Sequence, residues 1–257
     1  MYPGKPRIKR LPMGRTSNAR EKLLQVAFDL IWQHSYGSVS VDDICERAQV
    51  RKGSFYHFFP SKSDLAVAAY EEHWQASRAK YDRIFSPLVA PLERIANYCN
   101  GIYENQRQIQ QQTGRVLGCP FASVGCELST QDEKIRRKAG EMFERMCQYL
   151  ETTLRDAHEK GMIGRQDFSA SARTVFSLVT GMLLQAKVKN DADVLRGLGD
   201  VVLQLIGVRQ ALRSADVQAV AKPVIQNSTT QPERAARKTP RRTAPLVRGL
   251  TEASPGV

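Results

Sequence analysis

A short stretch from Ser40 to Lys62 constrains the fold of this chain more than any other part of the sequence. Its first segment starts with Ser40-x-x-Asp43, an acidic variant of the capping box that marks helix N-termini. The apolar residues of this segment then form one short stripe at Val41, Ile44 and Ala48. A second helical segment, Arg51 to Phe58, follows almost at once. Two short helices joined by so tight a turn are typical of a helix-turn-helix.

The second segment, RKGSFYHF, has the side chains that a DNA-reading helix needs. In a helix-turn-helix the second helix enters the major groove and packs its inner face on the first helix. We expect Phe55, with Phe58 or Phe59, to face that core. The residues predicted to contact the duplex are Arg51, Lys52, Gly53, Ser54, Tyr56 and His57.

Each of these residue types suits a different part of the duplex. Arg and Lys match guanine edges and phosphates, Tyr and His donate hydrogen bonds to phosphate oxygens, and glycine lets the backbone come close. The helix start at Ser61-Lys62-Ser63-Asp64 adds backbone N–H groups that can hold a phosphate. The simpler interpretation, a solvated turn that is merely basic and aromatic, is disfavoured by the tight helical spacing.

These residues resemble the helix-turn-helix of the TetR/AcrR family. The resemblance runs without gaps from about residue 17 to residue 66, on Val41, Ile44, Ala48, Val50, Lys52-Gly53-Ser54-Phe55-Tyr56, Phe59, Ser61-Lys62 and Leu65. Two positions depart from the family pattern. Gln49 replaces the usual turn glycine, at a cost on the order of 1 kcal/mol if the backbone there is left-handed. Arg51 replaces a common small serine and adds a cation at the start of the recognition helix.

The resemblance implies an all-α homodimer whose two heads read successive major grooves of a palindromic double-stranded DNA operator. By position, phosphate contacts fall to Ser40, Tyr56, His57 and Lys62. The residues nearest the bases are Arg51, Lys52 and Ser54. The implied function is a transcriptional repressor that a small molecule or a thiol-reactive signal releases from DNA.

Helical periodicity predicts about nine helices in two domains, with an extension at each end. The predicted parts are a disordered basic arm (1–15), the helix-turn-helix domain (16–65), a helical ligand-binding and dimerisation domain (66–208) and a disordered basic tail (209–257). Thr130-x-x-Glu133 reads as the capping box of a long helix, and Asp191 or Asp193 is expected to open the last one. The final two apolar helices form a hairpin, so two copies can make a four-helix interface. A purely intramolecular core is the alternative.

Residues 114–129, GRVLGCPFASVGCELS, are the most distinctive stretch of the predicted body. Pro120 fits the first turn of a helix, which places Cys119 at or beside its N-cap. A thiol beside a helix N-terminus can have a lowered pKa and become reactive. Cys126 follows two turns later on the same face. Similar Gly-Cys-x(7)-Glu-Leu stretches occur in a subset of TetR-like regulators, some of which respond to oxidants or electrophiles, whereas free Cys is more often a small buried apolar residue.

Large apolar side chains at helical spacing are candidates for the lining of a ligand cavity. These candidates are Tyr103, Phe121, Met142, Met146 and Phe176. Such residues are more often plain core, so the expectation of a cavity rests on the family resemblance. No cofactor is expected. Cysteines at positions i and i+7 do not match a zinc site, so no metal is expected either.

The excess positive charge of the chain, +12, lies at its two ends. Residues 1–20 and residues 209–257 each carry a net charge of +6, while the 188 residues between them carry equal numbers of acidic and basic groups. Basic arms favour a polyanion, with nucleic acid first and anionic lipid second, although solubility and disorder alone would also explain them. Five cysteines without a secretory signal favour the reducing cytoplasm. No apolar run approaches 18 residues, so no membrane partner is expected.

Two other classes of function compete with a ligand-released repressor. A constitutive or architectural DNA-binding factor would share the same head but have no inducer. An enzyme using Cys119 lacks support, because the chain has four histidines, none at a telling position, and no glycine-rich phosphate loop.

The basic tail predicts a sequence-independent contribution to DNA affinity. Removing residues 210–257 should flatten the plot of log affinity against log salt concentration, because fewer counterions are released on binding. Titration of a labelled duplex at several salt concentrations measures this slope. A truncated chain with the full-length slope would remove the tail from the interface.

Overall fold

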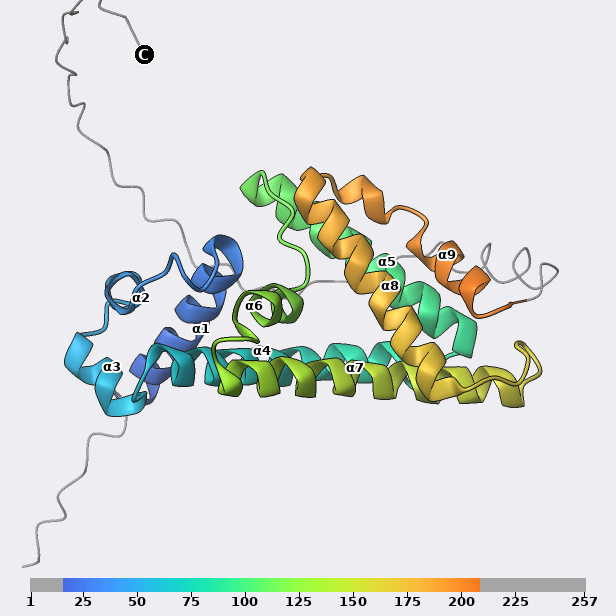
Figure 1. The fold of residues 1–257 in the computed structure, drawn as a ribbon, viewed down its shortest axis with the longest axis horizontal. Coiled ribbons are helices and arrows are strands. Elements are labelled where there is room, and N and C mark those ends of the chain that lie inside the picture. The colour runs from blue at the N-terminus through green and yellow to red at the C-terminus, as the bar shows by residue number, and fades with distance from the viewer. Residues whose placement is uncertain (1–15, 209–257) are drawn as a thin grey trace, which may run out of the picture. The chain divides into compact units, whose positions relative to one another are not determined.

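The computed structural model describes residues 16–208, and every regular element in that range is helical (Figure 1). The helices are α1 (Thr16–His34), α2 (Val41–Ala48), α3 (Lys52–Phe58), α4 (Lys62–Ile84), α5 (Pro91–Thr113), α6 (Pro120–Leu128), α7 (Glu133–Glu159), α8 (Phe168–Lys189), the 3-10 helix η1 (Ala192–Leu195) and α9 (Leu198–Leu205). This confirms the predicted all-α fold. The arm and tail predicted at residues 1–15 and 209–257 lie outside the described residues.

Helices α1, α2 and α3 pack with the start of α4 around a small apolar core, and this part of the protein is called the head. Phe55 of α3 is fully buried in this core with Ile44 of α2 and Leu65 of α4. Phe59 is the second buried ring and Phe58 is half-buried, which settles the choice between them. Truncating a buried Phe typically lowers the free energy of unfolding by about 3–5 kcal/mol. Phe55 therefore holds α3 in place against α1 and α2.

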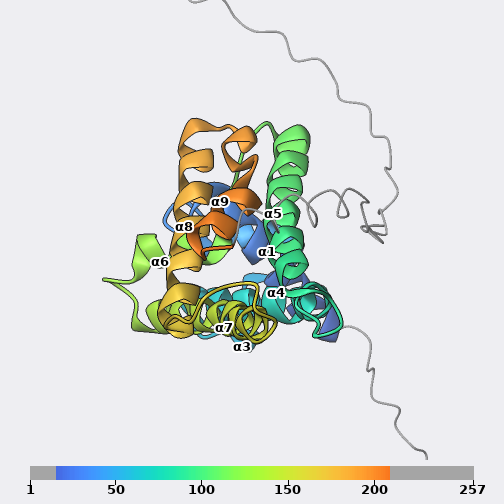
Figure 2. The ribbon, with the colours of Figure 1, turned by 90° about the vertical axis from the view of Figure 1, so that its right-hand side faces the viewer.

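A second apolar core forms around α7 in the rest of the protein, called the body, while Val124 and Leu128 of α6 and Ile135 of α7 pack into the first core. Helix α4 lies along α7, and both α5 and α8 pack on α7 (Figure 1). Helix α9 packs against α5 and α8 (Figure 2). Ion pairs also join α4 to α7: Asp64–Lys134 (2.6 Å), Glu71–Lys138 (3.1 Å) and Glu71–Arg145 (2.9 Å). Partly exposed pairs contribute at most about 1 kcal/mol each, so apolar packing holds the two helices together and the pairs set their register.

Two predicted helix starts are corrected by the structure. Helix α7 is capped by Asp132, whose carboxylate accepts the N–H of Ile135 (3.1 Å), so the predicted capping box of Thr130 and Glu133 is wrong. A carboxylate directly before the helix is a stronger acceptor than a hydroxyl two residues earlier. The predicted last helix is divided. Asp191 caps the short η1, and Gly197 (φ 76°) separates η1 from α9.

Gln49 takes the left-handed conformation that its position in the turn requires. Its φ and ψ are 55° and 42°, and its backbone N–H bonds to the carbonyl oxygens of Cys45 and Glu46. The strain expected from replacing the family glycine is therefore present. It is on the order of 1 kcal/mol, which a domain of this size can absorb.

His73 lies in an aromatic cluster where α1, α4 and α6 meet. Its ring stacks on Phe28 with the centroids 3.9 Å apart and the planes 12° from parallel. Trp32 and Phe121 flank it at centroid distances of 6.5 Å and 6.1 Å. Burial lowers the pKa of His73 to about 4. The imidazole is therefore neutral at pH 7 and behaves as one more flat ring in the cluster.

This burial predicts an acid-sensitive fold. The pKa of His73 is about 4 in the folded protein, below its ordinary value of 6.5. Between these two pH values the unfolded chain binds the proton more tightly than the folded one. The free energy of unfolding therefore falls as the pH drops from 6.5 to 4. Between pH 7 and pH 5 the loss should be about 1–2 kcal/mol. Urea denaturation of wild type and His73→Phe at both pH values measures it, and an equal acid loss in both proteins would contradict the assignment.

Candidate nucleic-acid interface

The N-terminus of α2 is closed by the predicted capping box. The Ser40 hydroxyl accepts the N–H of Asp43 (3.1 Å), and the Asp43 carboxylate accepts the N–H of Ser40 (2.8 Å). The side-chain and backbone hydrogen bonds from Ser40 lower the pKa of Asp43. The Ser40 hydroxyl also donates to Asp43 at 2.7 Å. In the free protein Ser40 therefore orients α2, and a phosphate contact would have to compete with the Asp43 carboxylate.

The outer face of α3 presents most of the residues predicted to contact DNA. Arg51, which is the N-cap of α3, and Lys52, Gly53, Tyr56 and His57 are all exposed, and Ser54 is half-buried. Tyr56 is 52% exposed although its ring meets the buried Phe55 edge-on, at 5.0 Å. A side chain added at Gly53 would meet no neighbouring atom within 4 Å, so this part of the helix is open to a close-approaching partner.

Lys52 is tied to the preceding helix. Its ammonium lies 2.8 Å from a carboxylate oxygen of Asp42 in α2, and both side chains are more than half exposed. The hydrogen bond to Asp42 raises the pKa of Lys52. Asp42 therefore places a negative charge beside the surface predicted to face DNA and would compete with any base or phosphate for Lys52.

Lys62 faces the protein as well as the solvent. Its ammonium donates to the carbonyl oxygens of Tyr36 (2.9 Å) and Val39 (2.8 Å) and lies 3.9 Å from the centre of the Tyr36 ring. Burial lowers the pKa of Lys62. In this structure the side chain predicted to hold a phosphate fastens the turn between α1 and α2.

The cysteines predicted to sense a signal lie on α6 in different surroundings. Cys119 is the N-cap of α6, as predicted, and its sulfur accepts the N–H of Ala122 at 3.5 Å. Burial raises the pKa of this thiol, with the helix N–H groups acting in the opposite direction. The lowered pKa expected from the helix terminus is therefore not found. Cys126 is exposed.

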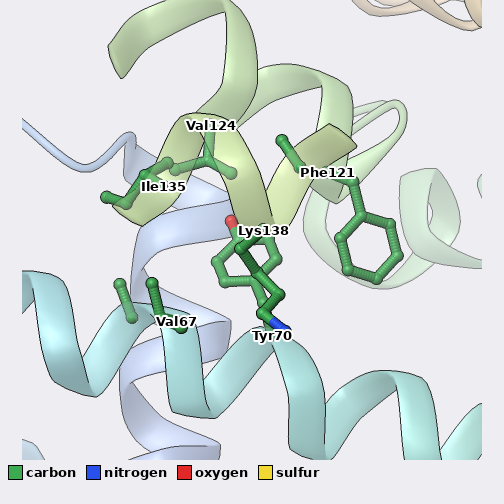
Figure 3. A pocket seen from close by; sticks show the side chains of 8 residues that line it. Val67, Tyr70, Phe121, Val124, Ile135 and Lys138 are labelled. Atoms are coloured by element: carbon green, nitrogen blue, oxygen red, sulfur yellow. The ribbon is translucent and has the colours of Figure 1, made fainter. Parts of the chain in front are cut away.

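The side chains predicted to line one ligand cavity are dispersed. Met142 and Met146 are buried in the body core, Phe176 packs on Phe143 with the centroids 5.0 Å apart, and the Tyr103 hydroxyl donates to Asp193 (2.8 Å). Phe121 instead lines a hollow of about 230 Å³ between α4, α6 and α7 (Figure 3).

The hollow between α4, α6 and α7 is mainly apolar. Its lining comprises Ala66, Val67, Tyr70, Phe121, Val124, Ile135, Lys138 and Ala139. The buried Tyr70 hydroxyl points into it and has no hydrogen-bond partner among the described residues (Figure 3). In residues 16–208, no group of three or more His, Cys, Asp or Glu side chains is arranged to hold a metal ion.

Sequence reasoning missed the residues that join α6 to the DNA-reading head. Trp32 of α1 donates its indole N–H to the carbonyl oxygen of Gly118 (3.2 Å), and Glu127 of α6 accepts two backbone N–H groups of the α1–α2 turn. The available signal was the Gly-Cys-x(7)-Glu-Leu stretch, which contains both Gly118 and Glu127. In this motif the contacts with the head come from the Gly118 carbonyl and the Glu127 carboxylate, and the cysteines make neither of them.

A helix-turn-helix with an exposed, basic second helix on an all-helical body defines a DNA-binding transcriptional regulator. Comparison with known proteins agrees. The model described as "Bacterial regulatory proteins, tetR family" matches residues 23–69, and "Tetracyclin repressor-like, C-terminal domain" matches residues 91–199. The chain belongs to the TetR family, a non-enzymatic family of helix-turn-helix transcriptional repressors that bind operator DNA.

Individual relatives cover most of the chain. An uncharacterized HTH-type transcriptional regulator from Lactococcus lactis subsp. lactis is 28% identical over 188 residues, which is 72% of this chain and 91% of that protein. The HTH-type transcriptional repressor NemR of Escherichia coli K12 is 26% identical over 69% of this chain and 88% of its own length. The crystal structure of E. coli NemR in its reduced form superposes with a TM-score of 0.66 at 25% identity, covering 75% of this chain and 99% of that one.

The Lys52–Asp42 pair predicts that Asp42→Asn strengthens DNA binding. The change frees the Lys52 ammonium and removes a negative charge from the α2–α3 surface. Affinity should rise about three- to ten-fold for every duplex sequence at low salt, with a steeper salt dependence. Fluorescence anisotropy measures both quantities. Glu104→Gln, which removes the partner of Arg107 on α5, is the matched control and should leave binding unchanged. A gain confined to one sequence would contradict this account of Lys52.

Proposed function

We propose that this protein is a homodimeric repressor that binds a palindromic operator and leaves it on receiving a small-molecule or thiol-reactive signal. The observation that carries the DNA-binding part is the outer face of α3, where Arg51, Lys52 and Tyr56 stand exposed while Phe55 fixes the helix from below. The residues proposed to contact phosphates are Ser40, Tyr56, His57 and Lys62, and those proposed to lie nearest the bases are Arg51, Lys52, Gly53 and Ser54.

Exposed apolar side chains on the last two helices support the homodimer. Leu184 (58% exposed) and Val188 (78%) lie on α8, and Val201 (43%) and Leu205 (47%) lie on α9. Helices α8 and α9 also pack on each other. Exposed apolar residues mark association surfaces, and two such helix pairs across a two-fold axis form a four-helix interface.

A dimer of this kind explains the expectation of a palindrome. The two-fold axis that relates the α8–α9 pairs also relates the two α3 helices, so each reads the same half-site on opposite strands. Half-sites of such dimers lie about one helical turn apart or a multiple of it. Operator symmetry thus follows from the symmetry of the protein.

Two features support an inducing signal. The hollow between α4, α6 and α7 contains the unpartnered Tyr70 hydroxyl and could grow around a small ligand if α6 shifts. Cys119 and Cys126 offer a thiol alternative on the same helix. The crystal structure of the related E. coli NemR is of its reduced form.

A constitutive DNA-binding factor without an inducer is the second candidate. It is favoured by the raised pKa of Cys119 and by the small size of the hollow. A thermal-shift screen of small molecules and electrophiles, followed by DNA binding with each hit, separates the two. A hit that weakens DNA binding favours the repressor, and stabilisers without effect on DNA favour the constitutive factor.

Disruption of the α8–α9 surface tests the dimer. Leu184→Glu combined with Val188→Glu should convert a dimer into a monomer, because burying two carboxylates in an apolar interface costs several kcal/mol. Light scattering after size-exclusion chromatography gives the mass, and operator affinity should fall with it. Leu88→Glu changes a side chain that is 95% exposed in the α4–α5 turn and serves as the control. A monomeric wild type, or a variant that stays dimeric, would contradict the assignment.

A further inference from the structure

Helix α6 is held firmly by the body of the protein. Gly125 lies so close to α7 that a Cβ added there would come within 3.1 Å of the Ala139 side chain. Lys187 of α8 donates to the Ser123 hydroxyl at 3.1 Å. These contacts fix the position of α6 relative to α7 and α8.

The segment leading into α6 is held by α5. The buried amide oxygen of Gln106 accepts the backbone N–H groups of Leu117 (3.1 Å) and Gly118 (2.8 Å). Gly118 has φ 71°, and its carbonyl oxygen accepts the Trp32 indole N–H of α1 at 3.2 Å. The start of α6 thus joins the body to the first helix of the head.

The end of α6 contacts the head a second time. The Glu127 carboxylate accepts the N–H of Tyr36 on one oxygen (2.9 Å) and the N–H of Gly37 on the other (2.6 Å). Successive N–H groups in a turn form a concavity that favours an anion. Gly37 suits this contact, because a Cβ at that position would lie 3.1 Å from a Glu127 oxygen.

The same turn is held from α4. The Lys62 ammonium donates to the carbonyl oxygens of Tyr36 and Val39, so a carboxylate and an ammonium together hold its N–H and carbonyl groups. The turn ends at Ser40, the N-cap of α2. Any change in its position moves α2, and α3 moves with it because both share the Ile44–Phe55 core.

We infer that Glu127 is a positioning residue for operator binding: its carboxylate, carried by α6, sets the orientation of α2 and α3 relative to the body. This rests on the proposed homodimeric operator binding. In a dimer, the spacing and angle of two recognition helices depend on how each head is fixed to its own body. A head released from Glu127 samples several orientations. The apparent affinity for DNA then falls in proportion to the fraction of heads that keep the orientation competent for binding.

A carboxylate at this position is matched to its task. Its two oxygens accept two N–H groups at once, whereas the amide of a Gln has one accepting oxygen and an NH₂ group that would face the second N–H. Glu127→Gln should therefore keep one of the two hydrogen bonds to the turn, and Glu127→Ala should keep neither. The graded series distinguishes loss of the contact from simple loss of charge.

The test compares full-length wild type, Glu127→Ala and Glu127→Gln on two probes. One is the duplex that wild type selects from random-sequence DNA, and the other has the same length and a scrambled sequence. Glu127→Ala should bind the selected duplex about ten-fold more weakly, the effect of losing about 1.4 kcal/mol, and the scrambled duplex as wild type does. Glu127→Gln should fall between. The Ala variant should also tolerate one inserted base pair between half-sites better than wild type.

Hydrogen exchange of the Tyr36 and Gly37 amides gives a readout that does not depend on DNA, and Glu127→Ala should accelerate it. Glu133→Ala, which removes the exposed partner of Arg136 on α7, is the control. If Glu127→Ala does not fold, Trp32→Phe removes the hydrogen bond from the indole N–H to the Gly118 carbonyl oxygen. This variant should relax the preference for one half-site spacing in the same way.

Three results would overturn the inference. They are wild-type affinity and spacing preference in Glu127→Ala, an equal loss on both duplexes, and unchanged exchange of the two amides. A wild-type protein that selects no sequence would instead refute the proposed function, while the exchange measurement still decides whether Glu127 holds the turn.

Discussion

The packing of α4 into both apolar cores is the constraint on which the rest of the structure depends. Leu65, Ala69 and Tyr70 belong to the core of the head, and Trp74, one turn further on, belongs to the core of the body. The 23 residues of α4 contain neither glycine nor proline, so no flexible break separates the two sets. A displacement of the body end of α4 therefore reaches the head as a movement of a nearly rigid rod.

The second connection, through α6, makes the position of the head determinate. One helix alone would let the head rotate about its axis, whereas α6 packs Val124 and Leu128 into the head core and adds the Trp32–Gly118 and Glu127–turn hydrogen bonds. These contacts lie beside the hollow lined by Phe121 and Tyr70 and on the helix that carries both sensing candidates, Cys119 and Cys126. A signal that shifts α6 would therefore act on the head directly.

Much of this could be predicted from the sequence where local chemistry decides. The Ser40–Asp43 capping box, the burial of Phe55 and the N-cap role of Cys119 follow from residue type and spacing, and the strained turn at Gln49 follows from the family resemblance. Contacts between segments far apart in the chain could not. Nothing near Lys62 indicates that its ammonium turns toward Tyr36 and Val39. The motif around Glu127 marks its own segment as distinctive but does not identify its partner, the α1–α2 turn some 90 residues earlier.

Two sequence predictions, the lowered pKa of Cys119 and the capping box at Thr130, are wrong for different reasons. The raised pKa of Cys119 comes from burial by helices that meet only in the folded protein, which outweighs the helix N-terminus visible in the sequence. The capping box at Thr130 failed because Asp132, two residues on, is the better cap. The ligand-cavity candidates stay a prediction; they share helical spacing, lie on α5, α6, α7 and α8 and face different neighbours.

The central claim is that two identical heads, each held at a fixed orientation, read one palindrome. Selection of bound duplexes from random-sequence DNA by the full-length protein tests it most directly. The account predicts an inverted repeat with a single preferred spacing of about one helical turn between half-site centres. Enrichment of an isolated half-site, of repeats with no fixed spacing, or of no sequence at all would contradict it.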